Sequence, residues 1–120
     1  MTYIYALVDP VEKRIRYIGK SDNPSGRLNA HVYEAMEIDS FIPNAPIWPR
    51  CVWIYRLIKN GLRPEIVILE KCKEDNWRET EDWWIGIFEN EGILNARRVA
   101  GKYPPAKSIR KYQMQEFNHD

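Results

Sequence analysis

The sequence lacks the features that mark membrane, secreted or low-complexity proteins. No apolar run approaches the roughly 18 residues of a membrane span, and the opening MTYIYALVDP has neither the basic segment nor the small-residue cleavage site of a signal peptide. No repeat or low-complexity run interrupts the 120 residues. We therefore expect one folded domain, cytoplasmic and without membrane contact.

Cysteine is scarce, with only Cys51 and Cys72 in the chain. Their separation matches no metal-binding or redox spacing. Two reduced, buried thiols are therefore expected rather than a disulfide, and neither is assigned a functional role.

Acidic residues are absent from residues 96–112, although the chain as a whole has a net charge of only +1. This segment predicts an anionic partner such as nucleic acid, while a solvated charged face is the ordinary alternative. The candidate nucleic-acid-binding residues are its six basic residues: Arg97, Arg98, Lys102, Lys107, Arg110 and Lys111.

Alternating apolar residues predict a hairpin at the start of the chain. In residues 2–8, Tyr3, Tyr5 and Leu7 share one strand face. An Asp-Pro turn signal follows, and residues 14–20 return as a second strand with Ile15 and Tyr17 on one face. Two antiparallel strands are expected.

Asn23 followed by Pro24 predicts the start of a helix that runs to Met36. Its apolar stripe is interpreted as Leu28, Val32 and Ala35. Arg27 and His31 flank this stripe, one turn apart.

Further elements follow an irregular proline-rich connection. Apolar pairs at i, i+4 spacing predict a helix that stops at Asn60-Gly61, and residues 63–72 form a short β-branched strand. Asn76 and Glu79 have capping-box spacing and open a helix that reaches about Asn90.

Glu81 lies in the middle of the apolar face of that last helix, four residues from both Trp77 and Ile85. A carboxylate that points toward a core is costly unless it is paired or binds a metal. Trp77 and Trp84 are assigned to the core, whereas Trp83 lies off the stripe and is a candidate for base stacking.

Each of these residues has an ordinary structural explanation when taken singly. Strand tyrosines are common core aromatics, and a histidine such as His31 is commonly a hydrogen-bonded structural residue. Their combination is more informative, because two tyrosines, an Arg/His pair and one distant carboxylate can converge on one pocket.

The motifs YIY at Tyr3, YIG at Tyr17, GRLNAH, ETEDWWI and ILN together resemble the GIY-YIG nuclease superfamily. The resemblance covers residues 2–95 and departs from the family at Tyr3, where the family has glycine. It implies an α+β fold, a small three-stranded mostly antiparallel sheet flanked by helices. Residues 1–95 would form the nuclease domain and residues 96–120 a basic extension.

The resemblance also implies roles for individual residues. Glu81 would be the one protein ligand of a divalent ion, Mg²⁺ or else Mn²⁺, and Tyr5 would be the general base on water. Tyr17 would orient water or phosphate, Arg27 would contact the phosphate and His31 would assist proton transfer.

Two supporting residues complete the predicted site. Lys20, if it reaches the site, would help Arg27 to lower the pKa of Tyr5. Asn95 would buttress the site by hydrogen bonds, although a turn residue that closes the helix explains it nearly as well.

The implied function is a metal-dependent endonuclease that hydrolyses DNA, with RNA not excluded, as a monomer or homodimer. Two alternatives stay open. One is a non-catalytic nucleic-acid-binding relative, and the other is an interaction domain in which the tyrosines and Glu81 form a structural hydrogen-bonded cluster.

Overall fold

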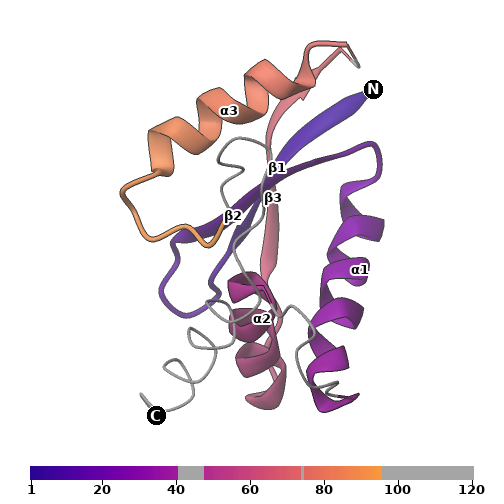
Figure 1. The fold of residues 1–120 in the computed structure, drawn as a ribbon, viewed down its shortest axis with the longest axis vertical. Helices are drawn as coiled ribbons and strands as arrows, with labels where there is room; N and C mark the ends of the chain where they lie inside the picture. Colours follow the sequence, from indigo (N-terminus) through magenta and orange to yellow (C-terminus); the bar gives the residue numbers. More distant parts are fainter. Residues whose placement is uncertain (41–47, 74, 96–120) are drawn as a thin grey trace.

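The computed structural model describes residues 1–40, 48–73 and 75–95. Within them, β1 (Thr2–Val8), β2 (Ile15–Ser21) and β3 (Glu65–Cys72) form one antiparallel sheet in the order β2-β1-β3 (Figure 1). The expected α+β class with a three-stranded sheet is confirmed.

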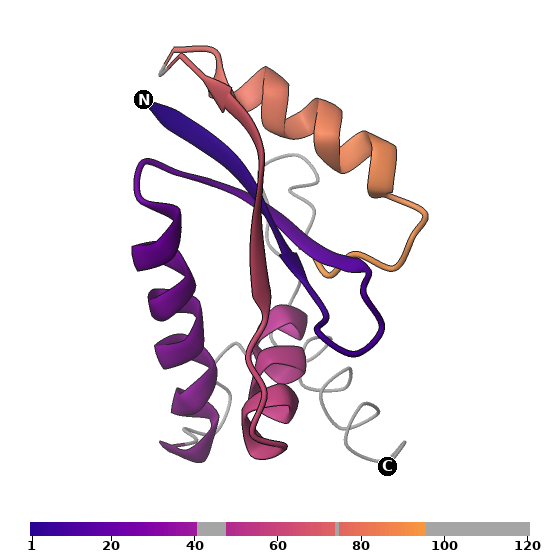
Figure 2. The same cartoon turned by 180° about the vertical axis from the view of Figure 1, so that it is seen from behind.

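Helices cover both faces of this sheet. The α1 helix (Pro24–Met36) and the α2 helix (Pro49–Lys59) pack on one face, and α3 (Trp77–Phe88) lies on the other (Figures 1 and 2). A 3₁₀ turn, Glu37–Ser40, follows α1.

The central strand β1 is buried on both faces, as its continuous apolar run predicts. Tyr5 and Leu7 face α1 and α2, whereas Ile4 and Ala6 face α3. All four side chains are at most 1% exposed. The first cluster is the larger of the two, so α1, α2 and β1 form the main core.

Two predicted helix ends are present, and one predicted cap is not formed. Asn23 Oδ1 accepts a hydrogen bond from Gly26 N at 3.3 Å, and Gly61, with φ of 73°, follows the C-terminus of α2. At α3 the expected capping box is wrong, because Asn76 makes no side-chain cap hydrogen bond. Its ψ of 14° departs from the extended backbone that aims a cap side chain at the helix.

The expectation that Ile15 and Tyr17 share a face is also wrong. The β1–β2 register pairs Leu7 with Tyr17 but Val8 with Ile15, so one additional residue, Arg16, bulges from β2. A bulge reverses the facing of the residues on its two sides. Tyr17 therefore packs beside Tyr5, while Ile15 packs on the face that α3 covers.

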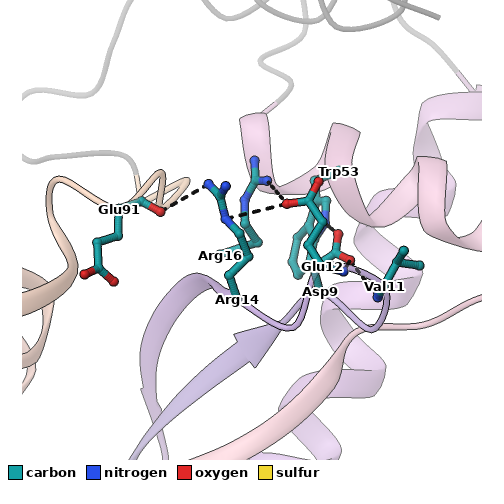
Figure 3. Close-up of polar contacts among 7 residues, drawn as sticks. All are labelled: Asp9, Val11, Glu12, Arg14, Arg16, Trp53 and Glu91. Carbon is teal, nitrogen blue, oxygen red and sulfur yellow. Dashed lines mark hydrogen bonds and ion pairs between the residues drawn. The ribbon is translucent and has the colours of Figure 1, made fainter.

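The hairpin turn between β1 and β2 is held by Asp9 (Figure 3). Its Oδ1 accepts hydrogen bonds from Val11 N at 2.8 Å and Glu12 N at 2.9 Å, and its Oδ2 accepts from Trp53 Nε1 at 3.0 Å. Burial raises the pKa of Asp9, but these hydrogen bonds and the charge of Arg16 outweigh burial and hold it below its usual value. One carboxylate thus joins the turn to α2.

The segment after α3 is attached to the same hairpin. Arg14 donates a hydrogen bond to the Glu91 carbonyl at 3.2 Å (Figure 3), and Leu94 N donates to the Arg16 carbonyl at 2.6 Å. Gly92 has a φ of 79°, and a side chain there would collide with the Arg14 guanidinium. A glycine is therefore required where the chain turns back toward β2.

The remaining expectations from composition have different outcomes. Cys51 and Cys72 are both buried and free, as expected. Within the described residues, no helix has the length and apolar character needed to cross a membrane. The basic segment 96–120, with its six candidate nucleic-acid-binding residues, lies outside the described residues.

Candidate functional site

A pocket of about 930 Å³ lies along β2. One wall is formed by β2 with the start of α1 and of α2, and the other wall is the side of α3 that faces them. Side chains separated by up to 90 residues in the sequence meet there. The predicted site residues that line the pocket are Tyr5, Tyr17, Lys20, Arg27, Glu81 and Asn95.

His31 does not line the pocket but lies directly behind Tyr5. Tyr5 Oη and His31 Nε2 are 2.7 Å apart, and both residues are 1% exposed. The Tyr17 ring meets the His31 ring edge-on, with centroids 5.1 Å apart. The sequence placed His31 beside the apolar stripe of α1, whereas the structure places it inside the core.

Burial determines the protonation of this pair. Burial, followed by the neighbouring Tyr17, raises the pKa of Tyr5, and Arg27 and Arg50 oppose this rise only in part. Burial and the same two arginines lower the pKa of His31 to about 3. Both side chains are therefore neutral at pH 7, and the Tyr5 hydroxyl and His31 Nε2 share a hydrogen bond whose direction follows the imidazole tautomer.

The net effect on Tyr5 is a raised pKa, whereas a lowered one was expected from Arg27 and from Lys20 if it reached the site. Arg27 acts in the expected direction, through its charge and a side-chain hydrogen bond to Tyr5, but burial is the larger effect. Lys20 instead lies over the Trp77 ring, with its Nζ 4.6 Å from the centroid. A buried phenol beside another phenol holds its proton more firmly than a free one.

Gly19, the last residue of YIG, gives the Tyr5 ring its space. The two residues are register partners on adjacent strands. A Cβ on Gly19 would lie 2.6 Å from Tyr5 Oη and 3.0 Å from a ring carbon of Tyr17. Any larger residue at this position would displace the two tyrosines, so the glycine is needed for the geometry of the site.

Tyr17 is the half-buried ring between the two arginines of the pocket. Burial raises its pKa, Arg50 and Arg27 lower it, and Glu81 adds a smaller rise. These influences place Glu81 and both arginines near one hydroxyl. The arrangement brings two cations and one carboxylate of opposite walls together around Tyr17.

Glu81 differs from the expectation of a carboxylate that points into the core. It is half-buried and lines the pocket, and no residue of α3 is fully buried. The helix covers the sheet with partly buried Trp77, Trp84, Ile85 and Phe88. The apolar face of α3 is therefore shallow, and Glu81 reaches solvent at its margin.

A divalent ion is chemically compatible with this pocket. Within residues 1–40, 48–73 and 75–95, no group of three or more His, Cys, Asp or Glu residues is placed to hold a metal. Mg²⁺ does not need such a cage, because it commonly binds one or two carboxylates and keeps several waters. Glu81 is such a carboxylate, and Asp82 and Glu89 line the same wall.

Asn95 joins the end of the described chain to the outer edge of β2. Its Oδ1 accepts a hydrogen bond from Ile18 N at 3.0 Å, and its Nδ2 donates to the Ile18 carbonyl at 2.7 Å. These two bonds imitate the pairing of one more strand. They hold the segment after α3 one residue away from Tyr17.

The exposed Trp83 lies outside the pocket lining. It is 60% exposed and meets the Trp84 ring edge-on at 5.0 Å. Trp77 lines the pocket, but Lys20 and Arg78 both lie over its ring, at 4.6 and 5.1 Å from the centroid. Trp83 is therefore the more accessible of the two for a stacked base.

Arg50 lines the pocket but belongs to none of the motifs from which the site was predicted. Its side chain is 13% exposed and pairs with Glu34 Oε1 at 2.9 Å. One signal was present in the sequence, because Arg50 follows Pro49 at the start of a helix. The positive end of the helix dipole disfavours a cation there.

Comparisons with protein-family models, with curated proteins and with solved structures found no match to this chain.

Proposed function

We propose that the protein is a metal-dependent endonuclease that hydrolyses phosphodiester bonds in DNA, with the active-site chemistry of the GIY-YIG nucleases that its motifs resemble. The observation that carries the proposal is the buried Tyr5–His31 hydrogen bond, whose tyrosine opens onto a pocket shared with Tyr17, Arg27 and Glu81. A base, a phosphate-binding cation and a metal ligand are the groups that this reaction requires.

Proton movement in the proposed reaction begins at Tyr5. Its Oη accepts a proton from the attacking water as its own proton passes to His31 Nε2, 2.7 Å away. The two transfers avoid a free tyrosinate, whose formation burial opposes. The water oxygen bonds to phosphorus, the bond to the leaving oxygen breaks, and that oxygen takes a proton from solvent.

The two transfers leave an imidazolium at His31, where burial, Arg27 and Arg50 lower the pKa to about 3. The negative charge of the bound phosphate therefore has to offset the two arginines. After cleavage His31 returns its proton to Tyr5, which releases one to solvent.

Arg27 and Tyr17 act on the phosphate in this proposal. The Arg27 guanidinium presents a planar fork of donors, which matches two phosphate oxygens. The Tyr17 hydroxyl donates a hydrogen bond that orients the phosphate next to Tyr5. The centroids of the Tyr5 and Tyr17 rings are 6.3 Å apart. Glu81 would hold the divalent ion, which supplies neutralisation of phosphate charge when bound.

A test of this proposal compares supercoiled plasmid with Mg²⁺ or Mn²⁺ and with chelator, for wild type, Tyr5→Phe and Glu81→Ala. We expect relaxed DNA only with metal. In both variants the cleavage rate should fall by a factor of about 100 or more. Glu79→Ala is the matched control, because Glu79 is an exposed carboxylate on the same helix that does not line the pocket. It should cut at the wild-type rate.

A non-catalytic nucleic-acid-binding module is the second candidate, favoured by the raised pKa of Tyr5. It predicts that wild type binds DNA or RNA but cuts neither plasmid, branched DNA nor RNA with either metal. Equal cutting by wild type and Glu81→Ala would also contradict the nuclease proposal, because the activity would then come from a contaminant or another site.

A further inference from the structure

Arg50 is held rigidly at the edge of the pocket. Its Nη2 donates to Glu34 Oε1 at 2.9 Å, and its guanidinium carbon lies 5.5 Å from the Tyr17 ring centroid and 5.8 Å from that of Trp48. A guanidinium stacked against aromatic rings and paired with a carboxylate has little freedom. It is therefore preorganised for whatever it binds.

Arg50 has one donor that no atom of the described residues accepts from, its buried Nε. A buried donor without a partner is unfavourable. A ligand in the pocket would meet the exposed part of the Arg50 side chain, which is 13% exposed and lines the pocket, rather than Nε.

Within the described residues, the two arginines on this wall have one ion-pair partner between them. Arg50 lies in the first turn of α2, which contains no acidic residue, so the helix dipole adds to its positive charge. Glu34 pairs with Arg50, but Arg27 forms no ion pair within residues 1–40, 48–73 and 75–95. Two partly buried cations with one partner carboxylate leave an excess positive charge that favours an anion.

Arg27 and Arg50 approach the tyrosines of the site from different helices. Arg27 hydrogen-bonds Tyr5, whereas the Arg50 guanidinium carbon lies 5.5 Å from the Tyr17 ring centroid. Both arginines line the pocket. The two cations therefore offer negative charge two contacts, beside different tyrosines.

We propose that Arg50 forms a second phosphate subsite, so that the pocket holds two successive phosphates of a polynucleotide, one at Arg27 and the next at Arg50. This inference rests on the proposed function and extends it, because it assigns the contact with the neighbouring phosphate of the strand to Arg50. Glu34, which does not line the pocket, positions the Arg50 guanidinium through its hydrogen bond, and Trp48 lines the pocket beside it.

The experiment measures binding without metal and therefore without cleavage. Isothermal titration calorimetry measures the dissociation constants of thymidine 3′,5′-bisphosphate, thymidine 5′-monophosphate and thymidine 5′-diphosphate. The two phosphates of the bisphosphate have the spacing of successive phosphates in a polynucleotide. For wild type we expect the bisphosphate to bind about tenfold more tightly than either of the other two, as one additional charge-assisted contact provides. Arg50→Ala should abolish this preference and leave monophosphate binding unchanged.

Two further variants exclude loss of folding and nonspecific charge effects. The double variant Arg50→Ala with Glu34→Ala removes the pair without leaving a partly buried carboxylate unpaired, and it should also lose the preference. Arg63→Ala removes an arginine that hydrogen-bonds Asn29 Oδ1 outside the pocket lining, and it should keep the preference.

The proposal is overturned if wild type does not prefer the bisphosphate, if the diphosphate binds best, or if Arg50→Ala keeps the preference. Failure of the nuclease proposal is a separate result. If the wild type cuts nothing and Arg50→Ala loses the preference for the bisphosphate, the second subsite is present without the reaction. A wild type that cuts, with Arg50→Ala unchanged in both assays, has the reaction without the subsite.

Discussion

At the scale of single residues, Tyr5 and His31 have unusual pKa values because both side chains are buried. A histidine at the surface of α1 would titrate near its ordinary pKa of about 6.5. In the core, burial and two nearby guanidinium groups keep the imidazole neutral, with a pKa of about 3. The neutral ring can accept the Tyr5 proton, which a protonated ring cannot.

The first prediction concerns the pH dependence of stability. Unfolded His31 binds a proton below about pH 6.5, whereas folded His31 binds one only near pH 3. The unfolded state thus binds more protons in this window, so stability falls as pH falls, by at most about 1.4 kcal/mol per unit. Between pH 6.5 and 4.5, wild type should lose about 2 kcal/mol more than His31→Gln.

Urea titrations at several pH values measure this difference. Glutamine keeps an acceptor for the Tyr5 hydroxyl and does not titrate. All other titratable groups therefore contribute equally to the pH dependence of stability in the two proteins. Parallel stability curves for wild type and His31→Gln would show that His31 titrates normally in the folded protein, contrary to the buried neutral imidazole.

The α3 helix is held by fewer buried side chains than α1 and α2. It has no fully buried residue, whereas α2 has five. Its polar attachments include the Asn95 hydrogen bonds to Ile18 and the Trp84 Nε1 hydrogen bond to Glu70 Oε1 at 3.0 Å. Elements with few buried contacts open locally at low free energy.

The second prediction is that α3 exchanges its amide hydrogens faster than α2 and β1. Asn95→Ala removes two hydrogen bonds to the β2 edge and should destabilise the protein by about 1–3 kcal/mol. Exchange should accelerate most in α3, as measured by hydrogen–deuterium exchange mass spectrometry. Asn90→Ala, an exposed asparagine in the same segment, should change nothing. Equal acceleration in α2 would instead indicate global destabilisation.

This behaviour of α3 bears on the proposed function, because the helix supplies Glu81 to the pocket while β2 supplies Tyr17. The distance between Glu81, the proposed metal ligand, and the proposed phosphate contacts therefore depends on how well α3 is held against the sheet. A variant such as Asn95→Ala should therefore lower the cleavage rate while α1, α2 and β1 remain folded.

At the scale of the whole molecule, the described chain has one pocket with the proposed nuclease residues. A single site cuts one strand in each encounter. We therefore predict that open-circular plasmid accumulates before linear plasmid and that the initial rate is proportional to protein concentration. Gel analysis of plasmid time courses measures both properties. Linear plasmid that appears at the same time as open-circular plasmid, at a rate that rises as the square of the protein concentration, would indicate a dimer that cuts both strands.

Much of the fold follows from short-range sequence patterns. The alternation in residues 2–8, the Asn23-Pro24 start and the glycine after α2 each act through neighbouring residues, and the corresponding elements have nearly the expected bounds. Six of the seven proposed catalytic and supporting residues line one pocket. The roles of these residues and the nuclease activity itself stay proposals.

Long-range packing produced the features that local patterns did not predict. The bulge at Arg16 depends on the pairing of β1 with β2, and it decides that Tyr17 rather than Ile15 lies beside Tyr5. The burial that sets the pKa of Tyr5 and His31 depends on how α1 packs against the sheet. Arg50 enters the pocket only because α2 begins beside Tyr17, a proximity between residues 33 positions apart that no local pattern encodes.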